Sequence, residues 1–267
     1  MLWRDITNKS ERLGISIDQV LREEIHKAIL VSLSHVGAFN YMVFQGGTAL
    51  RLFYRNPRFS EDLDFVLRKN KDFDITRNIS DIQRFVKYEF PFINKVTIRT
   101  RREDKVLQRV ILKISGQTFQ EFRIHVELAR VPSYRNRPRI LEYHPFNPVV
   151  RVEEPDEILA DKVVALGNRP YLKGRDVWDI YFLIEEKKLT IPWDMVLKKA
   201  KDYGTTPSNL RKGISECIER LKEDGLKILN NELLRFLPKR SFDQYQEMFD
   251  EIVSTVIENV RGGYLEE

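Results

Sequence analysis

The pattern of apolar residues changes once along the chain, between residues 150 and 155, and this change limits the fold more than any other feature. Before it, short stretches such as 62–68 and 122–129 alternate apolar and polar residues, which is typical of strands with one buried face. After it, apolar residues recur every three or four positions, as in amphipathic helices. Pro155 suits the first position of a helix. The sequence therefore predicts an α/β domain over residues 1–153 and an all-helical domain over residues 154–267.

The boundaries of individual elements follow from the same periods and from residues that begin or end helices. Ser16 and Gln19 have the spacing of a capping box, as do Ser241 and Gln244. Four of the eleven prolines lie within 131–150, so we expect a loop or irregular crossover there. The expected helices are 16–37, 48–55, 79–90, 156–166, 175–187, 193–202, 206–222 and 241–260, and the expected strands are 41–44, 62–68, 94–100, 106–114, 122–129 and 149–154.

Composition excludes several classes of protein. The chain is 42% hydrophobic and 32% charged, which indicates a globular protein. No apolar run approaches the ~18 residues that a membrane span needs, and the charged N-terminus lacks a signal core, so we expect a cytoplasmic protein with no membrane partner. Cys217 is the single cysteine, which excludes an internal disulfide. The four histidines lack the spacing of a dedicated zinc site.

Positive charge is concentrated in the middle of the chain. The net charge is +5, yet residues 95–113 alone carry a net +5 and residues 123–151 a net +4. A basic region on an otherwise slightly acidic chain suggests a surface that meets polyanions, although charged side chains also commonly just solvate strands. The candidate RNA-binding residues are Arg99, Arg101, Arg102, Lys105 and Arg109.

The residues with the clearest chemistry are two carboxylates in the segment SEDLDF. Asp62 and Asp64 lie two positions apart on an expected strand, so both point to one face while Leu63 and Phe65 enter the core. Adjacent carboxylates repel one another, and a bound Mg²⁺ cancels that repulsion because hard cations prefer carboxylate oxygens. An exposed strand face would give the same pattern.

Glycine and hydroxyl residues precede this pair. Gly46 and Gly47 lie between an expected strand and a helical turn, where backbone N–H groups can approach a phosphate closely. Thr48 begins the turn, and Arg58 and Ser60 lie just ahead of the carboxylates. A tight turn alone would also explain the glycines.

A third carboxylate lies on another expected strand, in FRIHVELAR. Glu127 shares a face with His125 and would complete a three-carboxylate metal site if this strand lay beside the Asp62–Asp64 pair. For His125 itself, a partly exposed strand position is the simpler interpretation.

Two polar positions interrupt apolar helices of the second domain. Lys162 lies along or beside an apolar stripe, where an ammonium needs a partner or must reach outward; a phosphate is one such partner. Asp176 and Asp179 flank a very apolar helix, and Asp176 is also placed to cap it.

Taken in order, these segments resemble the AbiEii/AbiGii toxin family. The resemblance rests on Gly46–Leu50 (GGTAL), on RFSEDLDF over 58–65 and on ADKVVALGNRPYLKGRDVWDIYFL over 160–183. It implies an α+β fold, with a DNA-polymerase-β-like nucleotidyltransferase core on a mixed sheet followed by an all-helical domain. It also implies a toxin of type IV toxin–antitoxin or abortive-infection systems, and hence a possible antitoxin partner.

The resemblance further implies an enzyme that binds NTP with Mg²⁺ or Mn²⁺ and transfers a nucleotide to RNA, in some members to the tRNA 3′ end. Carried over by position, Gly47 and Ser60 would hold NTP phosphates and Asp62 and Asp64 the metal. Lys162 and Asp176 would serve nucleotide binding and catalysis. The full set of candidates is Asp62, Asp64, Glu127, Lys162 and Asp176 as catalytic, Asp62, Asp64 and Glu127 as metal ligands, and Gly46, Gly47, Thr48, Arg58, Ser60 and Lys162 as nucleotide-binding.

Two other functions remain open at this point. The first is a nucleotidyltransferase of the same fold that modifies a small molecule or a protein, which would not need the basic middle region. The second is a non-catalytic module that binds nucleotide, against which the presence of both Asp62 and Asp64 argues.

Overall fold

The computed structural model describes residues 1–103 and 107–262, and the chain divides into two compact units. The first unit contains Met1–Arg55 and Phe59–Glu153. The second contains the chain from Glu154 onward together with three residues from far upstream, Asn56–Arg58. The chain therefore passes between the units three times, and each unit is described separately below.

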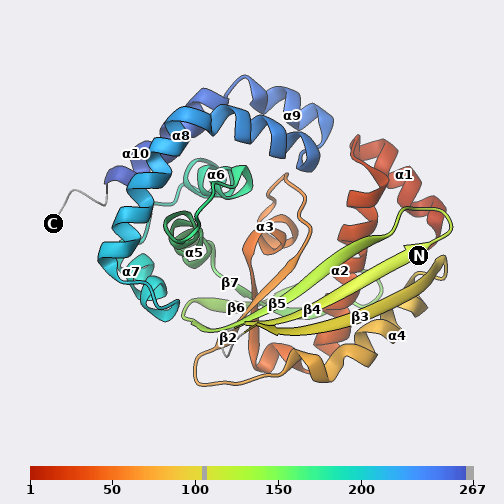
Figure 1. The fold of residues 1–267 in the computed structure, drawn as a ribbon. Coiled ribbons are helices and arrows are strands. Elements are labelled where there is room, and N and C mark those ends of the chain that lie inside the picture. Colours follow the sequence, from red (N-terminus) through yellow and green to blue (C-terminus); the bar gives the residue numbers. More distant parts are fainter. Residues whose placement is uncertain (104–106, 263–267) are drawn as a thin grey trace. The chain divides into compact units, whose positions relative to one another are not determined.

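The first unit is built on a seven-stranded mixed sheet with the strand order β3-β4-β5-β2-β1-β7-β6. Strand β2 pairs in parallel with β5 and antiparallel with β1, and β1 pairs in parallel with β7. Figure 1 shows β3, β4 and β5 as long strands lying side by side. The strands are β1 (Met42–Gln45), β2 (Leu63–Arg68), β3 (Ile93–Glu103), β4 (Leu107–Gly116), β5 (Phe122–Ser133), β6 (Asn136–Ile140) and β7 (Val149–Glu153).

Alternation along these strands gives the sheet one apolar and one polar face. On β5, Phe122, Ile124, Val126 and Leu128 are buried, while the residues between them are half-buried or exposed. Helix α2 (Ile17–His35) packs against α4 (Ile79–Glu89), and α4 packs on β3. The buried strand residues and these helices form the core of the unit, which leaves polar side chains on the opposite face.

Two further α-helices and two 3₁₀ turns, Ala38–Asn40 and Ile75–Asn78, complete the regular structure described for this unit. Helix α1 (Trp3–Leu13) packs on α2, whose N-terminus is capped by the Ser16 side chain accepting from the Gln19 N–H. Helix α3 (Gly46–Tyr54) follows β1 directly and contacts both β1 and β2. It is this helix that brings the two glycines next to the strand of carboxylates.

All regular structure described for the second unit is helical. It consists of α5 (Pro155–Asn168), α6 (Gly174–Tyr181), a π-helical turn (Phe182–Glu186), α7 (Trp193–Asp202), α8 (Pro207–Phe236), α9 (Lys239–Gln246) and α10 (Phe249–Gly262). Helix α8 packs against α5, α6 and α10. The α5–α8 approach depends on glycine, because a Cβ at Gly213 would lie 1.8 Å from the Gly167 carbonyl oxygen. No described helix of the chain has the length and apolar character to cross a membrane.

The predicted α+β class is confirmed: a mixed sheet with helices is followed by an all-helical region. Strand β6 is the main departure, because residues 131–150 were expected to lack regular structure. Its Pro138 is accommodated since β6 is the edge strand, where a missing N–H costs no ladder hydrogen bond.

The other differences are in helices. Helix α1 was not expected, and α8 continues to Phe236, fourteen residues past the predicted end at 222. The predicted helix 241–260 is two helices, and Ser241 lies inside α9 rather than at its cap, which is Pro238. These errors share a cause: packing between helices, not local sequence, decides where a helix continues or breaks.

Candidate active site

One row of side chains crosses the polar face of the sheet from acidic to basic residues. In the strand register, Asp64 on β2 lies opposite Glu127 on β5, and Glu127 lies opposite Arg109 on β4. The next position in the row, on β3, is Arg101. The predicted proximity of Glu127 to the strand of carboxylates is therefore what the parallel β2–β5 pairing produces.

Helix α3 places its first residues against this row. Gly46 has φ +78°, a left-handed conformation that favours glycine, and a Cβ there would lie 2.8 Å from Asp64 Oδ2. Gly46, Gly47 and Thr48 are all buried at the start of the helix. The absence of a side chain at Gly46 thus lets the Asp64 carboxylate reach the helix N-terminus, where unpaired N–H groups favour anions.

Asp62 is fixed by neighbours on helix α3 and strand β5. It lies just before β2, its carbonyl oxygen accepts from the Thr48 hydroxyl, and its Oδ1 accepts from the His125 backbone N–H at 3.3 Å. In the adjoining segment, His26 Nε2 of α2 lies 3.0 Å from the Glu61 carbonyl oxygen. Ser60 is half-buried two residues ahead of Asp62.

The carboxylates affect one another electrostatically. The pKa of Asp62 is raised above its ordinary value by burial; the nearby His125 opposes this shift, and the charge of Glu127 adds to it. His125 Nδ1 lies 3.7 Å from Asp62 Oδ1 and 3.9 Å from Glu127 Oε1. Because burial and the charge of Glu127 disfavour the ionised form of Asp62, a cation bound beside Asp62 would stabilise the site.

Glu127 has a cationic partner on the neighbouring strand. Arg109 Nε donates to Glu127 Oε1 at 2.7 Å, and both side chains are about one-quarter exposed, at 24% and 23%. The sequence analysis predicted different roles for these two residues: Arg109 in RNA binding and Glu127 as a metal ligand. The antiparallel register of β4 and β5 brings them together.

The donor set Asp62, Asp64 and Glu127 suits a divalent cation such as Mg²⁺ or Mn²⁺, because all its ligands are carboxylate oxygens on one face. In the structure, however, the ligand atoms of these three residues do not all lie within 4.8 Å of one another. Over residues 1–103 and 107–262, the group of three metal-type ligands within 4.8 Å of one another is a different one, Glu153, Glu157 and Asp161.

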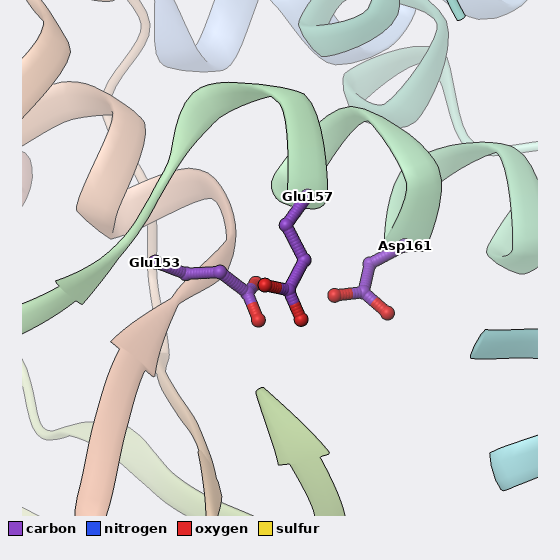
Figure 2. A group of neighbouring side chains, drawn as sticks. All are labelled: Glu153, Glu157 and Asp161. Atoms are coloured by element: carbon purple, nitrogen blue, oxygen red, sulfur yellow. The ribbon is translucent and has the colours of Figure 1, made fainter. Parts of the chain in front are cut away.

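Figure 2 shows that other group, where β7 gives way to α5. Inside the helical unit, Lys199 Nζ lies 2.6 Å from Glu157 Oε1 and 3.0 Å from Asp161 Oδ2, and Lys199 and Glu157 are both fully buried. A lysine already supplies the positive charge to these two carboxylates. We therefore interpret them as a structural ion pair of the helical unit rather than as a metal centre.

A basic groove continues the polar face beyond the carboxylates. Its volume is about 580 Å³, and its charged lining comes from three adjacent strands: Arg99, Arg109, Lys113 and Arg123. His125 lines it as well. Arg109 and His125 thus belong both to the groove and to the carboxylate site. Of the predicted RNA-binding residues, Arg99 and Arg109 line it, Arg101 and Arg102 lie on β3, and Lys105 lies outside the described residues.

In the helical unit, the predicted residues Lys162 and Asp176 contact each other. Lys162 Nζ lies 2.8 Å from Asp176 Oδ1 and 2.7 Å from Asp179 Oδ2, and Arg169 also pairs with Asp176. Burial would raise the pKa of Asp176, but Lys162 and Arg169 outweigh it and bring this pKa to about 2. Burial likewise disfavours charge on Lys162, yet the two carboxylates leave its pKa raised.

Arg58, which the sequence predicted as a phosphate contact, is paired with Asp179 within the helical unit. Its guanidinium is buried, and Nε and Nη2 donate to Asp179 at 3.0 and 2.8 Å. Asn56 Nδ2 also donates to Asp179, at 3.0 Å, and Trp178 Nε1 donates to Asn56. Asp179 is therefore the centre of a buried network in the helical unit. The sequence showed Asp179 in an apolar helix, but no local signal identified Asn56 or Arg58 as its partners.

The comparisons with known proteins agree with this architecture. The family model described as "Nucleotidyl transferase AbiEii toxin, Type IV TA system" matches residues 28–259. Among solved structures, MenT4, a nucleotidyltransferase toxin from Mycobacterium tuberculosis, has a TM-score of 0.60 at 16% identity, covering 98% of this chain and 90% of its own. JHP933 from Helicobacter pylori has a TM-score of 0.52 at 21% identity, covering 95% and 100%. No curated protein sequence matches the chain.

Proposed function

The chain belongs to the AbiEii family of nucleotidyl transferase toxins of type IV toxin–antitoxin systems, and on that premise we propose that it transfers a nucleoside monophosphate from an NTP to an RNA acceptor in a reaction that depends on Mg²⁺ or Mn²⁺. The predicted enzyme class and family are confirmed by the match over residues 28–259. The family also implies an NTP substrate and an antitoxin partner. The RNA acceptor, with the tRNA 3′ end as the first candidate, and the cytoplasm as the place of action are our inferences.

The observation that carries this proposal is the row Asp64–Glu127–Arg109. It joins a set of hard oxygen ligands directly to a groove lined by arginine and lysine. An acceptor that is a polyanion would bind such a groove through its phosphates, and one end of it would then lie at the carboxylates. A small neutral acceptor would gain nothing from the groove.

In the transfer step, the acceptor hydroxyl oxygen forms a bond to the α-phosphorus while the bond from that phosphorus to the β-bridging oxygen breaks. Pyrophosphate leaves with the electron pair, and Glu127 takes the hydroxyl proton. A divalent ion held by Asp62, Asp64 and Glu127 would neutralise the phosphate oxygens. The backbone N–H groups at Gly46 and Gly47, with the Ser60 hydroxyl, donate to the triphosphate, and Thr48 positions Asp62 through its carbonyl.

We assign this chemistry to the first unit and a supporting role to the second. Lys162 and Asp176 are proposed to serve nucleotide binding, with the Lys162 ammonium as a point charge for phosphate. Within the helical unit, its contacts at 2.8 and 2.7 Å to Asp176 and Asp179 hold that ammonium in one place.

The direct test is an incubation of the protein with total tRNA, Mg²⁺ and each α-³²P-labelled NTP in turn, beside the Asp64→Asn variant. We expect label on RNA with at least one NTP. The variant should lose about a hundredfold or more, since loss of residues that only support metal ligands already costs about ten- to a hundredfold. Full activity of Asp64→Asn would refute the site.

Charge reversal in the groove separates RNA from other acceptors. The variants Arg99→Glu and Arg123→Glu should lose RNA labelling, because the groove then repels the acceptor's phosphates. If these variants label a small-molecule or protein acceptor at an unchanged rate, the natural acceptor is not RNA. Binding of NTP with no product at any acceptor would identify a non-catalytic module.

A further inference from the structure

Arg109 lines the basic groove, and its guanidinium donates a hydrogen bond to Glu127, a predicted metal ligand. Its Nε–Oε1 distance to Glu127 is 2.7 Å, and the strand register sets the two residues directly opposite each other. A guanidinium and a divalent cation compete for the same carboxylate, because each neutralises its charge and each repels the other.

The spacing of the carboxylates fits this competition. Asp62 Oδ1 is held by the His125 backbone N–H, and Glu127 Oε1 by Arg109. Over the described residues, Asp62, Asp64 and Glu127 are not among the carboxylates gathered within 4.8 Å. In the structure, then, Glu127 is bound to Arg109 while the three carboxylates are not gathered into one closed group.

The groove offers Arg109 another partner. Arg99, Lys113 and Arg123 line the same groove, so a phosphodiester bound there meets several cations at once, and Arg109 is the cation nearest to the carboxylates. Phosphate accepts two parallel N–H bonds from a guanidinium as a carboxylate does. An RNA phosphate can therefore replace Glu127 on Arg109.

We propose that Arg109 is a positioning residue that couples RNA binding to completion of the metal site: it holds Glu127 until an RNA phosphate in the groove takes the guanidinium, and Glu127 then joins Asp62 and Asp64. This inference rests on the proposed function and adds to it an order of events. It implies that a bound metal–nucleotide complex reacts efficiently only when an acceptor is present. Hydrolysis of the NTP by water is thereby limited.

Thermodynamic linkage gives the proposal a measurable form without turnover. If RNA releases Glu127 to the metal, RNA raises the affinity for Mn²⁺, and Mn²⁺ raises the affinity for RNA by the same factor. Coupling between sites commonly amounts to about five- to a hundredfold, and we expect about tenfold here.

The experiment titrates the full chain with Mn²⁺, detected by electron paramagnetic resonance, with and without a short single-stranded polyuridine RNA. In the natural sequence, RNA should tighten Mn²⁺ binding about tenfold. In Arg109→Gln, Mn²⁺ should already bind more tightly without RNA, and RNA should add nothing further. The matched control is Arg123→Gln, which removes one charge from the same groove at a residue that lines it away from Glu127. It should weaken RNA binding and leave the RNA-free affinity for Mn²⁺ unchanged.

Equal RNA-free Mn²⁺ affinities in Arg109→Gln and Arg123→Gln would overturn the proposal, as would an undiminished effect of RNA in Arg109→Gln. A further check is the double variant with Glu127→Gln. The gain from Arg109→Gln should vanish in that background, and a gain that persists would reflect only the removal of a nearby positive charge. These outcomes are measured by binding alone, so they are distinct from failure of the labelling assay, which would refute RNA transfer itself.

Discussion

The carboxylate of Asp64 lies so close to Gly46 that a Cβ on the glycine would come within 2.8 Å of Oδ2. Gly46 also has φ +78°. The glycine therefore serves two needs at once: it permits the left-handed turn into α3, and it leaves room for the carboxylate beside the helix N-terminus. Sequence reasoning offered a role near phosphate or in a tight turn, but not the contact with Asp64.

Replacing Gly46 with alanine should consequently damage the site more than the fold. Gly204 provides a matched control, because its φ is +75° and nothing lies within 4 Å of the Cβ that alanine would add. Both variants should lose about 1 kcal/mol of stability from the left-handed backbone, as measured by urea unfolding. Only Gly46→Ala should lose RNA labelling. If both variants keep full activity, the contact with Asp64 is unimportant.

The salt dependence of RNA binding should show whether RNA phosphates contact the basic groove. Each phosphate contact to a single strand contributes a slope of about −0.7 in the plot of log affinity against log salt. Arg123→Gln should reduce the magnitude of the slope by about that amount, as measured by fluorescence anisotropy with polyuridine RNA. Arg84→Gln, on the exposed surface of α4, should leave it unchanged. Equal slopes in both variants would place RNA elsewhere.

Acid should weaken the helical unit through Asp176. Its pKa is lowered from 3.8 to about 2, so its ionised form stabilises the folded state above pH 4, and this contribution disappears as pH falls toward 2. The shift corresponds to about 2 kcal/mol for this nearly buried side chain. Asp176→Asn should lose about that much at neutral pH and little near pH 2. Unfolding by urea at several pH values measures the difference, and a difference independent of pH would contradict the assignment.

The buried lysine of the helical unit should be necessary for stability. Lys199→Met removes the cation from Glu157 and Asp161 and leaves their charge buried, which should cost about 3–5 kcal/mol. Lys201→Met changes an exposed lysine of the same helix and should stay within about 0.5 kcal/mol. Adding Glu157→Gln to Lys199→Met should recover part of the loss. Thermal unfolding of the full chain distinguishes these cases.

The sequence predicted best those features that depend on a short period. Alternation in 62–68 and 122–129 placed Asp64 and Glu127 on exposed strand faces, and the β2–β5 pairing then brought them opposite each other. The capping residue Ser16 was also identified correctly, because a cap depends only on residues three positions apart.

What the sequence missed depends on contacts between distant segments. Arg109 and Glu127 are separated by a hairpin whose register no local signal fixes, so their ion pair was not foreseen. Asn56 and Arg58 pair with residues more than 120 positions away. The capping box predicted at Ser241 and Gln244 was wrong although its residues have the correct spacing. Both residues lie inside a helix that begins at Lys239.

The membership of Asn56–Arg58 in the helical unit has a consequence for any attempt to divide the protein. A cut at residue 153 looks natural, since the apolar period changes there, but a fragment from Glu154 onward would carry Asp179 without Arg58 and Asn56. The fully buried carboxylate would then lack three of its hydrogen-bond donors. Recombination or cloning at residue 153 would therefore not transfer the helical unit intact. The unit also needs the segment Asn56–Arg58, which lies far upstream in the sequence.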